Sequence, residues 1–247
     1  MAGEIIKTEG IVLAIRPWSR TSHIVTWLTP DHGCVTTLVK GAVRPKSAFL
    51  GQYDLFYTCD LLYYARATAD LHALRETSPR VMRDGLRGRW RETALAGYAA
   101  GLVKDLAPAN GEAAAWFAFF DSLLTRLERH SALEGSNGAK DINPLQELAR
   151  LEMEILKLAG WSPDFSGMDP RADWTPFAID HGRCGDGTRT VRLSPRTVAV
   201  LTRPDAPGHA TETVEDAVRF LGVFLSYHLD TPPDVRRSLV ALVSRPI

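Results

Sequence analysis

The hydrophobic pattern of the chain changes once, at Ser78-Pro79, and this change separates a strand-forming part from a helix-forming part. Before it, β-branched, aromatic and other apolar residues stand in short alternating runs that Gly, Pro and Asp interrupt. After it, apolar residues recur every three or four positions, which is typical of amphipathic helices. Ser is a favoured N-cap and Pro a favoured first helical residue, so the pair predicts the start of the helical region.

The strand-forming part predicts a small β-barrel. Five strands are expected within about 75 residues, at 4–15, 23–28, 34–40, 53–65 and 71–76. The connection after the third strand is the longest, and this arrangement matches an OB-type barrel. We therefore predict an α+β fold that begins with a five-stranded OB-fold barrel at residues 1–78.

The helix-forming part predicts a helical domain that carries a small insertion. We expect helices at 90–106, 112–128, 144–160, from Ser194-Pro195 onward, at 213–229 and at 233–243. Residues 161–192 interrupt this pattern with Pro, Gly and Asp, and they contain two short predicted strands, 177–179 and 190–193. The predicted helical domain thus comprises residues 79–160 and 193–247, and residues 161–192 form an inserted module.

The connection at residues 38–53 is the most informative stretch for function. It carries Lys40, Arg44 and Lys46, with no acidic residue before Asp54, and its Gly and Pro residues prevent regular structure. Lys and Arg on such a connection can contact the phosphates of a long polyanion. The stretch therefore predicts a nucleic-acid contact loop on the barrel.

Residues near this connection add to the predicted nucleic-acid site. Arg16 and Arg20 flank a neighbouring predicted loop and supply two further cations. Single-strand binding also uses aromatic faces on which bases stack. Trp18 and Phe49 are predicted to lie in loops and are therefore the stacking candidates, whereas alternation predicts that most other barrel rings lie in the core.

The charge distribution is asymmetric although the net charge is zero. Residues 1–91 contain 13 Lys and Arg against eight Asp and Glu, an excess of five positive charges. Such an imbalance suggests a basic face on this part of the chain, and ordinary scatter of surface charge is the alternative interpretation. No run approaches the ~20 apolar residues of a membrane span, no secretory signal is visible, and three widely spaced cysteines favour reduced thiols. We expect a cytoplasmic protein with no membrane partner.

No signature of catalysis or metal binding is present. The sequence lacks Gly-x-Ser-x-Gly, Gly-x-x-x-x-Gly-Lys and His-Glu-x-x-His, so we expect no enzyme and no cofactor. His181 and Cys184 have ligand types at a two-residue gap, but no Cys-x-x-Cys accompanies them, and structural zinc normally takes four Cys or His ligands. Two alternatives stay open: an enzyme whose site assembles only in three dimensions, and a module that binds protein alone.

Three stretches of the chain resemble the bacterial RecO recombination-mediator family. They are Glu9-Gly-Ile-Val-Leu, Thr36-Thr-Leu-Val-Lys-Gly-Ala-Val-Arg-Pro-Lys-Ser, and Leu225-Ser-Tyr-His-Leu-Asp followed by Arg236-Arg-Ser-Leu. The order of parts is also similar, so the resemblance covers nearly the whole chain. Many family members carry a four-cysteine zinc module, whereas residues 161–192 retain only Cys184. The resemblance thus implies a zinc-finger-like insertion that has lost its cysteine ligands, with Trp161, Trp174 and Phe177 supplying its core.

The resemblance implies a non-enzymatic role in DNA repair. Proteins of this family bind single- and double-stranded DNA, anneal complementary strands and contact the acidic, apolar C-terminal tail of the single-strand-binding protein. With RecR they help RecA load onto coated single strands. Position by position, the family's basic loop matches Lys40 and Arg44, with Lys46 alongside. The location implied is the bacterial cytoplasm, in association with the nucleoid.

Overall fold

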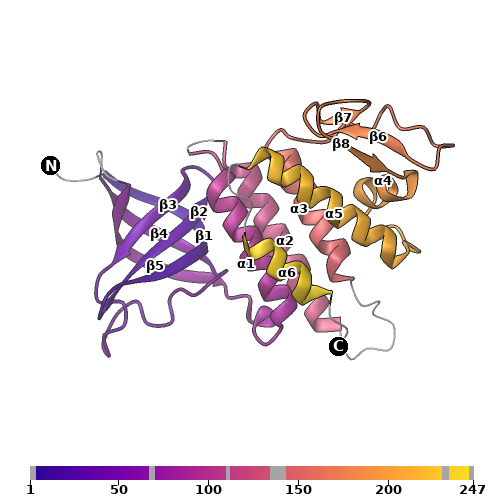
Figure 1. Cartoon of the computed structure of the whole chain (residues 1–247). Coiled ribbons are helices and arrows are strands. Elements are labelled where there is room, and N and C mark those ends of the chain that lie inside the picture. Colours follow the sequence, from indigo (N-terminus) through magenta and orange to yellow (C-terminus); the bar gives the residue numbers. More distant parts are fainter. Residues whose placement is uncertain (1–3, 67–69, 110–111, 134–142, 230–233, 245–247) are drawn as a thin grey trace. The chain divides into compact units, whose positions relative to one another are not determined.

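The chain folds into two compact units, Met1–Ser136 and Asn137–Ile247, in a computed structural model (Figure 1). The structure describes residues 4–66, 70–109, 112–133, 143–229 and 234–244. A five-stranded barrel followed by helices and a small second sheet confirms the predicted α+β class. The finer domain limits, 1–78, 79–160 with 193–247, and 161–192, stay predictions.

The first unit begins with a closed barrel in the strand order β1-β2-β3-β5-β4. Its strands are β1 (Glu4–Ser19), β2 (Ser22–Thr29), β3 (Gly33–Val39), β4 (Thr58–Ala65) and β5 (Leu71–Val81). The β3–β5 pair is parallel and the other four pairs are antiparallel. This order is that of an OB-fold.

The barrel interior is filled by alternate residues of the strands, as expected for a small barrel. Trp27 is fully buried at its centre, and its indole Nε1 donates a hydrogen bond to Thr37 Oγ1 at 2.9 Å. That bond satisfies a polar group that would otherwise be costly to bury. Tyr57 and Tyr63 are also buried, and Phe49 and Tyr53 pack against this core while partly exposed. Most barrel rings therefore lie in or against the core, as predicted.

Two predicted boundaries in the barrel are wrong. Strand β5 runs through Ser78-Pro79 to Val81, so this pair does not start a helix. Pro79 faces Cys59 beside a register shift in the β4–β5 ladder, where a missing N–H costs little. Strand β4 begins at Thr58 rather than at residue 53, since Phe56 adopts a left-handed φ of 67° that no strand allows.

A short linker joins the barrel to two helices within the first unit. It contains η1 (Asp84–Leu86) and leads to α1 (Trp90–Leu106) and α2 (Ala114–Leu133). The guanidinium of Arg83 is buried, donates to Thr125 Oγ1 at 2.7 Å and forms a short ion pair with Asp121. Because Asp121 and Thr125 are on α2, Arg83 fastens the linker to that helix.

The described part of the second unit contains four helices and a three-stranded sheet. The helices are α3 (Pro144–Leu158), α4 (Pro195–Thr202), α5 (Thr211–His228) and α6 (Asp234–Val243). Asn143 caps α3 by accepting from the Leu145 N–H at 3.0 Å, and Ser194 caps α4 by accepting from the Thr197 N–H at 3.1 Å. Both helix starts are confirmed. The predicted start of α6 at residue 233 lies outside the described residues.

The inserted module is built on the sheet β7-β6-β8. Strands β6 (Thr175–Ala178) and β8 (Thr190–Leu193) match the predicted strands, and β7 (Arg183–Cys184) was not predicted because it is only two residues long. Phe177 is fully buried, with its ring 5.1 Å from that of Phe220 on α5. Phe177 therefore supplies the core, as predicted.

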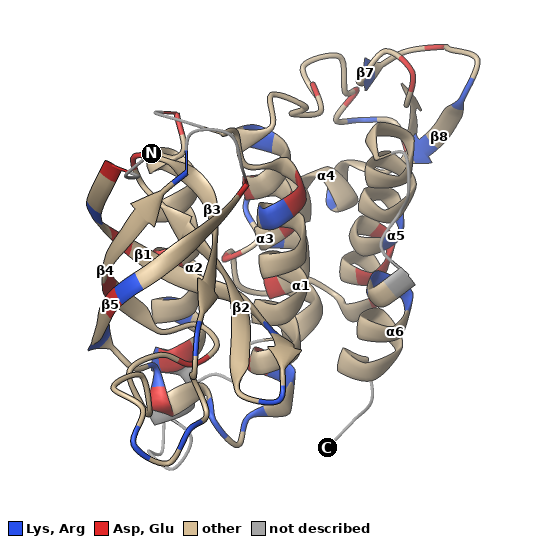
Figure 2. Ribbon diagram, turned by 90° about the vertical axis from the view of Figure 1, so that its left-hand side faces the viewer, with Lys and Arg blue, Asp and Glu red and all other residues tan. Residues whose placement is uncertain are grey.

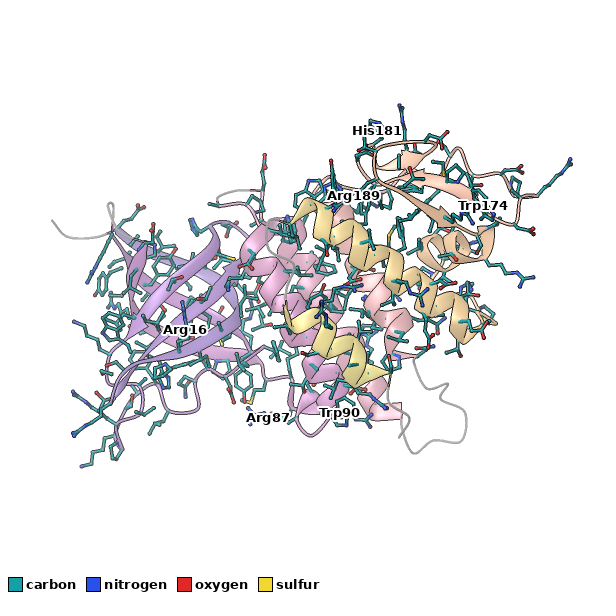
Figure 3. All side chains as sticks on the ribbon, viewed as in Figure 1. Arg16, Arg87, Trp90, Trp174, His181 and Arg189 are labelled. Atoms are coloured by element: carbon teal, nitrogen blue, oxygen red, sulfur yellow. The ribbon has the colours of Figure 1, made fainter. Side chains whose placement is uncertain are left out.

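Trp174, by contrast, is not a core residue. It is 46 % exposed, and the Arg192 guanidinium lies 4.2 Å from its ring centroid (Figure 3). Trp161 is half-buried and stacks on His228 with ring centroids 5.0 Å apart. Among the described residues, no group of three or more His, Cys, Asp or Glu side chains is placed to hold a metal ion.

A carboxylate fastens the turn of this module. Asp180 accepts hydrogen bonds from the Thr188 backbone N–H at 2.9 Å and from its hydroxyl at 2.6 Å. These bonds lower the pKa of Asp180 from 3.8 to about 2. A Cβ at Gly187 would lie only 2.3 Å from Asp180 Oδ1, so glycine is required for this close approach.

The lowered pKa of Asp180 predicts an acid-sensitive module. The Asp180 carboxylate contributes fully to the free energy of unfolding above pH 3.8. This contribution is lost as the pH falls toward about 2, since the folded state then takes up a proton that the unfolded state already holds. We expect Asp180→Ala to lower Tm at pH 6, and the difference from the unmodified chain to narrow toward pH 2. Asp186→Ala, which changes an exposed carboxylate of the same turn, is the control. A difference that is constant over this range would contradict the assignment.

Candidate nucleic-acid interface

The β1–β2 hairpin presents Trp18 to solvent by means of a β-bulge. Pro17 pairs with His23 and Ser19 pairs with Ser22, so Trp18 is an extra residue in β1. A bulge re-aims the side chain at its position, and the Trp18 indole is 60 % exposed. The prediction that Trp18 lies in a loop is wrong, because β1 continues to Ser19.

The connection from β3 to β4 is held against the same hairpin. The Val43 N–H donates to the Thr21 carbonyl at 3.3 Å, and the Gly41 N–H donates to Ser22 Oγ at 3.2 Å. Gly41 has a φ of 67°, a left-handed conformation that glycine adopts without strain. These contacts place Lys40 and Arg44, which flank the bonded segment, at the end of the barrel that carries Arg20.

The predicted cations share this end of the barrel and face solvent. The exposed side chains are those of Arg16, Arg20, Lys40, Arg44 and Lys46. Within the described parts of the chain, none of these five forms an ion pair. Figure 2 shows Lys and Arg positions along the loops at the lower end of the barrel. Among the described residues, the structure thus leaves the predicted cations exposed and without an ion pair.

Phe49, the second predicted stacking residue, is placed differently from Trp18. It is half-buried and packs against the core cluster of the barrel. Its ring therefore anchors the 40–56 connection to the barrel and offers only part of its surface to a ligand.

Sequence reasoning did not include Arg87, which the structure places beside the connection. Its guanidinium donates to Asp54 at 2.8 Å and to the Tyr57 hydroxyl at 2.7 Å, and it lies 5.5 Å from the Tyr57 ring centroid. The signal was present in the sequence as Arg87-Gly-Arg-Trp-Arg, a short basic and aromatic segment. Trp90 in that segment is exposed (Figure 3).

The second unit contains a separate groove of about 1070 Å³ between α5, α6 and the sheet. Its apolar wall comes mainly from valines of α5 and α6, including Val218, Val223 and Val240. Its charged residues are four arginines and one glutamate: Arg189, Arg219, Arg236, Arg237 and Glu215. Arg219 pairs with Asp216 and Arg236 with Glu152, whereas Arg189 and Arg237 form no ion pair among the described residues. A groove with apolar walls and two such arginines suits a peptide that is both apolar and acidic.

Arg236 positions the helix that forms one wall of this groove. It donates through Nε and Nη2 to the two carboxylate oxygens of Glu152 on α3, at 2.6 and 2.8 Å, and to the Val218 carbonyl at 2.7 Å. Glu152 is fully buried. A Cβ at Gly222 would lie 2.5 Å from Arg236 Nη1, so this glycine of α5 makes room for the guanidinium.

The barrel order and the helices that follow define a protein of the OB-fold class with an added helical region. Two family models match the chain: "Recombination protein O N terminal" over residues 1–81 and "Recombination protein O C terminal" over residues 87–237. The chain belongs to the RecO family of DNA repair proteins. The resemblance noted in the sequence is therefore confirmed.

Curated relatives that match over nearly the full length are named "DNA repair protein RecO". The protein of Geobacter metallireducens is 31 % identical over 93 % of this chain and 94 % of its own. The protein of Anaeromyxobacter dehalogenans is 28 % identical over 95 % of this chain and 95 % of its own. The protein of Salinibacter ruber is 25 % identical over 97 % of this chain and 94 % of its own. No helix among the described residues has the length and apolar character needed to cross a membrane.

The Arg236 contacts generate a stability prediction. Arg236→Met removes the guanidinium that pairs with the buried Glu152 carboxylate, and we expect a loss of about 3 kcal/mol in the free energy of unfolding. Arg237→Met, at an exposed neighbouring position on α6, should change it by less than about 0.5 kcal/mol. Urea denaturation of both variants measures these values. Equal losses would show that Arg236 does not anchor α6.

Proposed function

We propose that the chain is a DNA-binding recombination mediator that performs no covalent chemistry. In this proposal it binds single- and double-stranded DNA, anneals complementary strands and helps load the recombinase onto strands coated by single-strand-binding protein. The observation that carries the proposal is the group of exposed, unneutralised cations at the barrel end that holds the β1–β2 hairpin and the 40–56 connection. Family membership supports the DNA-repair context.

The proposed mechanism is electrostatic. Cations that neutralise phosphates release condensed counterions from the strand, and this release favours binding independently of base sequence. Lys40 and Arg44 lie beside the hairpin that carries Arg16 and Arg20, so one strand backbone can contact cations from two segments. Contacts of this kind bring strands together and leave their base edges free to pair.

The groove of the second unit is the proposed docking site for a protein partner. The acidic, apolar C-terminal tail of single-strand-binding protein has the chemistry that its valines and arginines favour. RecR, and RecA indirectly, are proposed as further partners on family membership alone. The proposed location is the bacterial cytoplasm, in association with the nucleoid.

Removal of the two motif cations should weaken DNA binding in a salt-dependent way. For Lys40→Ala with Arg44→Ala, we expect lower affinity for labelled single strands, and the slope of log affinity against log salt to fall in magnitude by about 1.4. Arg75→Ala with Lys104→Ala removes the same charge from residues that are paired with neighbouring acids. Fluorescence anisotropy at several salt concentrations gives both slopes. If the two double variants behave alike, Lys40 and Arg44 do not bind DNA.

If the groove binds the tail of single-strand-binding protein, a charge change in its wall should weaken that binding. Val223→Asp adds a carboxylate to the groove wall, and we expect it to weaken binding of a synthetic tail peptide by about tenfold. Val235→Asp on α6 is the matched control, because Val235 is also exposed but does not line the groove. Equal peptide binding by the two variants would place the partner elsewhere. An annealing assay on coated and bare strands then shows whether tail binding is needed.

A further inference from the structure

The 40–56 connection and the barrel enclose an open cavity of about 560 Å³. This volume falls within the roughly 300–1,000 Å³ of ordinary small-molecule sites. Three aliphatic side chains of the connection border it while remaining largely solvent-accessible: Val43 is 47 %, Leu50 49 % and Leu55 46 % exposed. Exposed apolar side chains that converge on one cavity indicate a surface prepared for a ligand.

The cavity is lined by rings that carry polar atoms. His23, Tyr53 and Tyr57 contribute to its wall, and His23 Nδ1 lies 2.9 Å from the Tyr53 hydroxyl. Burial raises the pKa of Tyr53 from 10 to about 12, and the hydroxyl, like that of any ordinary tyrosine, is protonated at neutral pH. Arg87 borders the same cavity and holds the Tyr57 hydroxyl and Asp54. A flat ligand with hydrogen-bonding edges would find the partly exposed rings of Phe49 and Tyr53 and the polar atoms of His23 here.

The charge around the cavity points to the kind of ligand. Ala42 and Val43 border it and stand between Lys40 and Arg44, while Ile15 borders it and precedes Arg16. An apolar peptide side chain needs no cations at such a position. A nucleotide needs both an apolar cavity and nearby cations, because its base is flat and apolar on its faces and its phosphate is anionic.

We propose that this cavity accepts an unpaired nucleobase of a single strand whose phosphates lie on Lys40, Arg44 and Arg16. The inference rests on the DNA binding proposed above and goes beyond it, since it assigns a pocket to the base itself. A base held in a duplex cannot enter the cavity without being unpaired. The cavity therefore favours single strands over duplexes in addition to the electrostatic attraction that both share.

The test compares two strands of equal charge. Affinity is measured by anisotropy for an oligothymidylate and for an abasic oligomer of the same length, and the ratio of the two cancels the phosphate contribution. For the unmodified chain we expect the thymidylate to bind about tenfold tighter. Replacing the three rim residues together, Val43→Ser, Leu50→Ser and Leu55→Ser, should bring this ratio close to one.

The matched control changes three similarly exposed aliphatic residues outside the cavity, Ile5→Ser, Val81→Ser and Met82→Ser, and should keep the ratio of the unmodified chain. If the rim variant keeps the full ratio while DNA binding remains salt-dependent, the base pocket is wrong and the proposed function stands. If the unmodified chain binds neither strand, both proposals fail. A strand containing 5-iodouracil, irradiated in the complex, should cross-link to Phe49 or Tyr53, and a cross-link confined to other residues would also overturn the pocket.

Discussion

The parallel pairing of β3 with β5 is the constraint on which the first unit depends. Among the described residues, three pairs make this ladder, from Thr36 opposite Leu71 to Leu38 opposite Ala73, and they close the barrel. Since β5 occupies the edge of β3, the chain that leaves β3 must pass over the end of the barrel to reach β4. The length of the 40–56 connection follows from this route, and so does its position beside the β1–β2 hairpin, where its cations join those of another segment.

Much of this arrangement could be predicted from the sequence, because it depends on local chemistry. Alternation located the strands, and the caps at Asn143 and Ser194 located two helices, since a cap bond joins residues only two or three apart. Ser78-Pro79 has the same composition as a cap and yet lies in a strand. There, pairing with β4 outweighs local preference, and no local pattern reveals a partner about 20 residues away. The predicted cations are exposed, and their role stays a prediction, whereas Arg87 was missed because its contacts to Asp54 and Tyr57 are long-range.

The two units stabilise their loops by different means. In the first, Arg83 holds a linker to α2 by charge-assisted bonds, and aromatic anchors hold the 40–56 connection to the barrel. In the second, the inserted module depends on the buried ring of Phe177 and on the bonds from Thr188 to Asp180. A hydrophobic centre and one carboxylate thus organise a segment that retains a single cysteine, and Trp174 is left at its surface.

The bulge at Trp18 has a consequence for how this surface can vary. One extra residue in β1 directs the indole outward, so its orientation depends on the number of residues in the hairpin as much as on their identity. Loss of one residue between Arg16 and Ser19 would restore regular pairing and remove the extra position that carries the exposed indole. A substitution at this tip therefore changes one side chain on an existing bulge, whereas a change in hairpin length removes or adds the bulge itself.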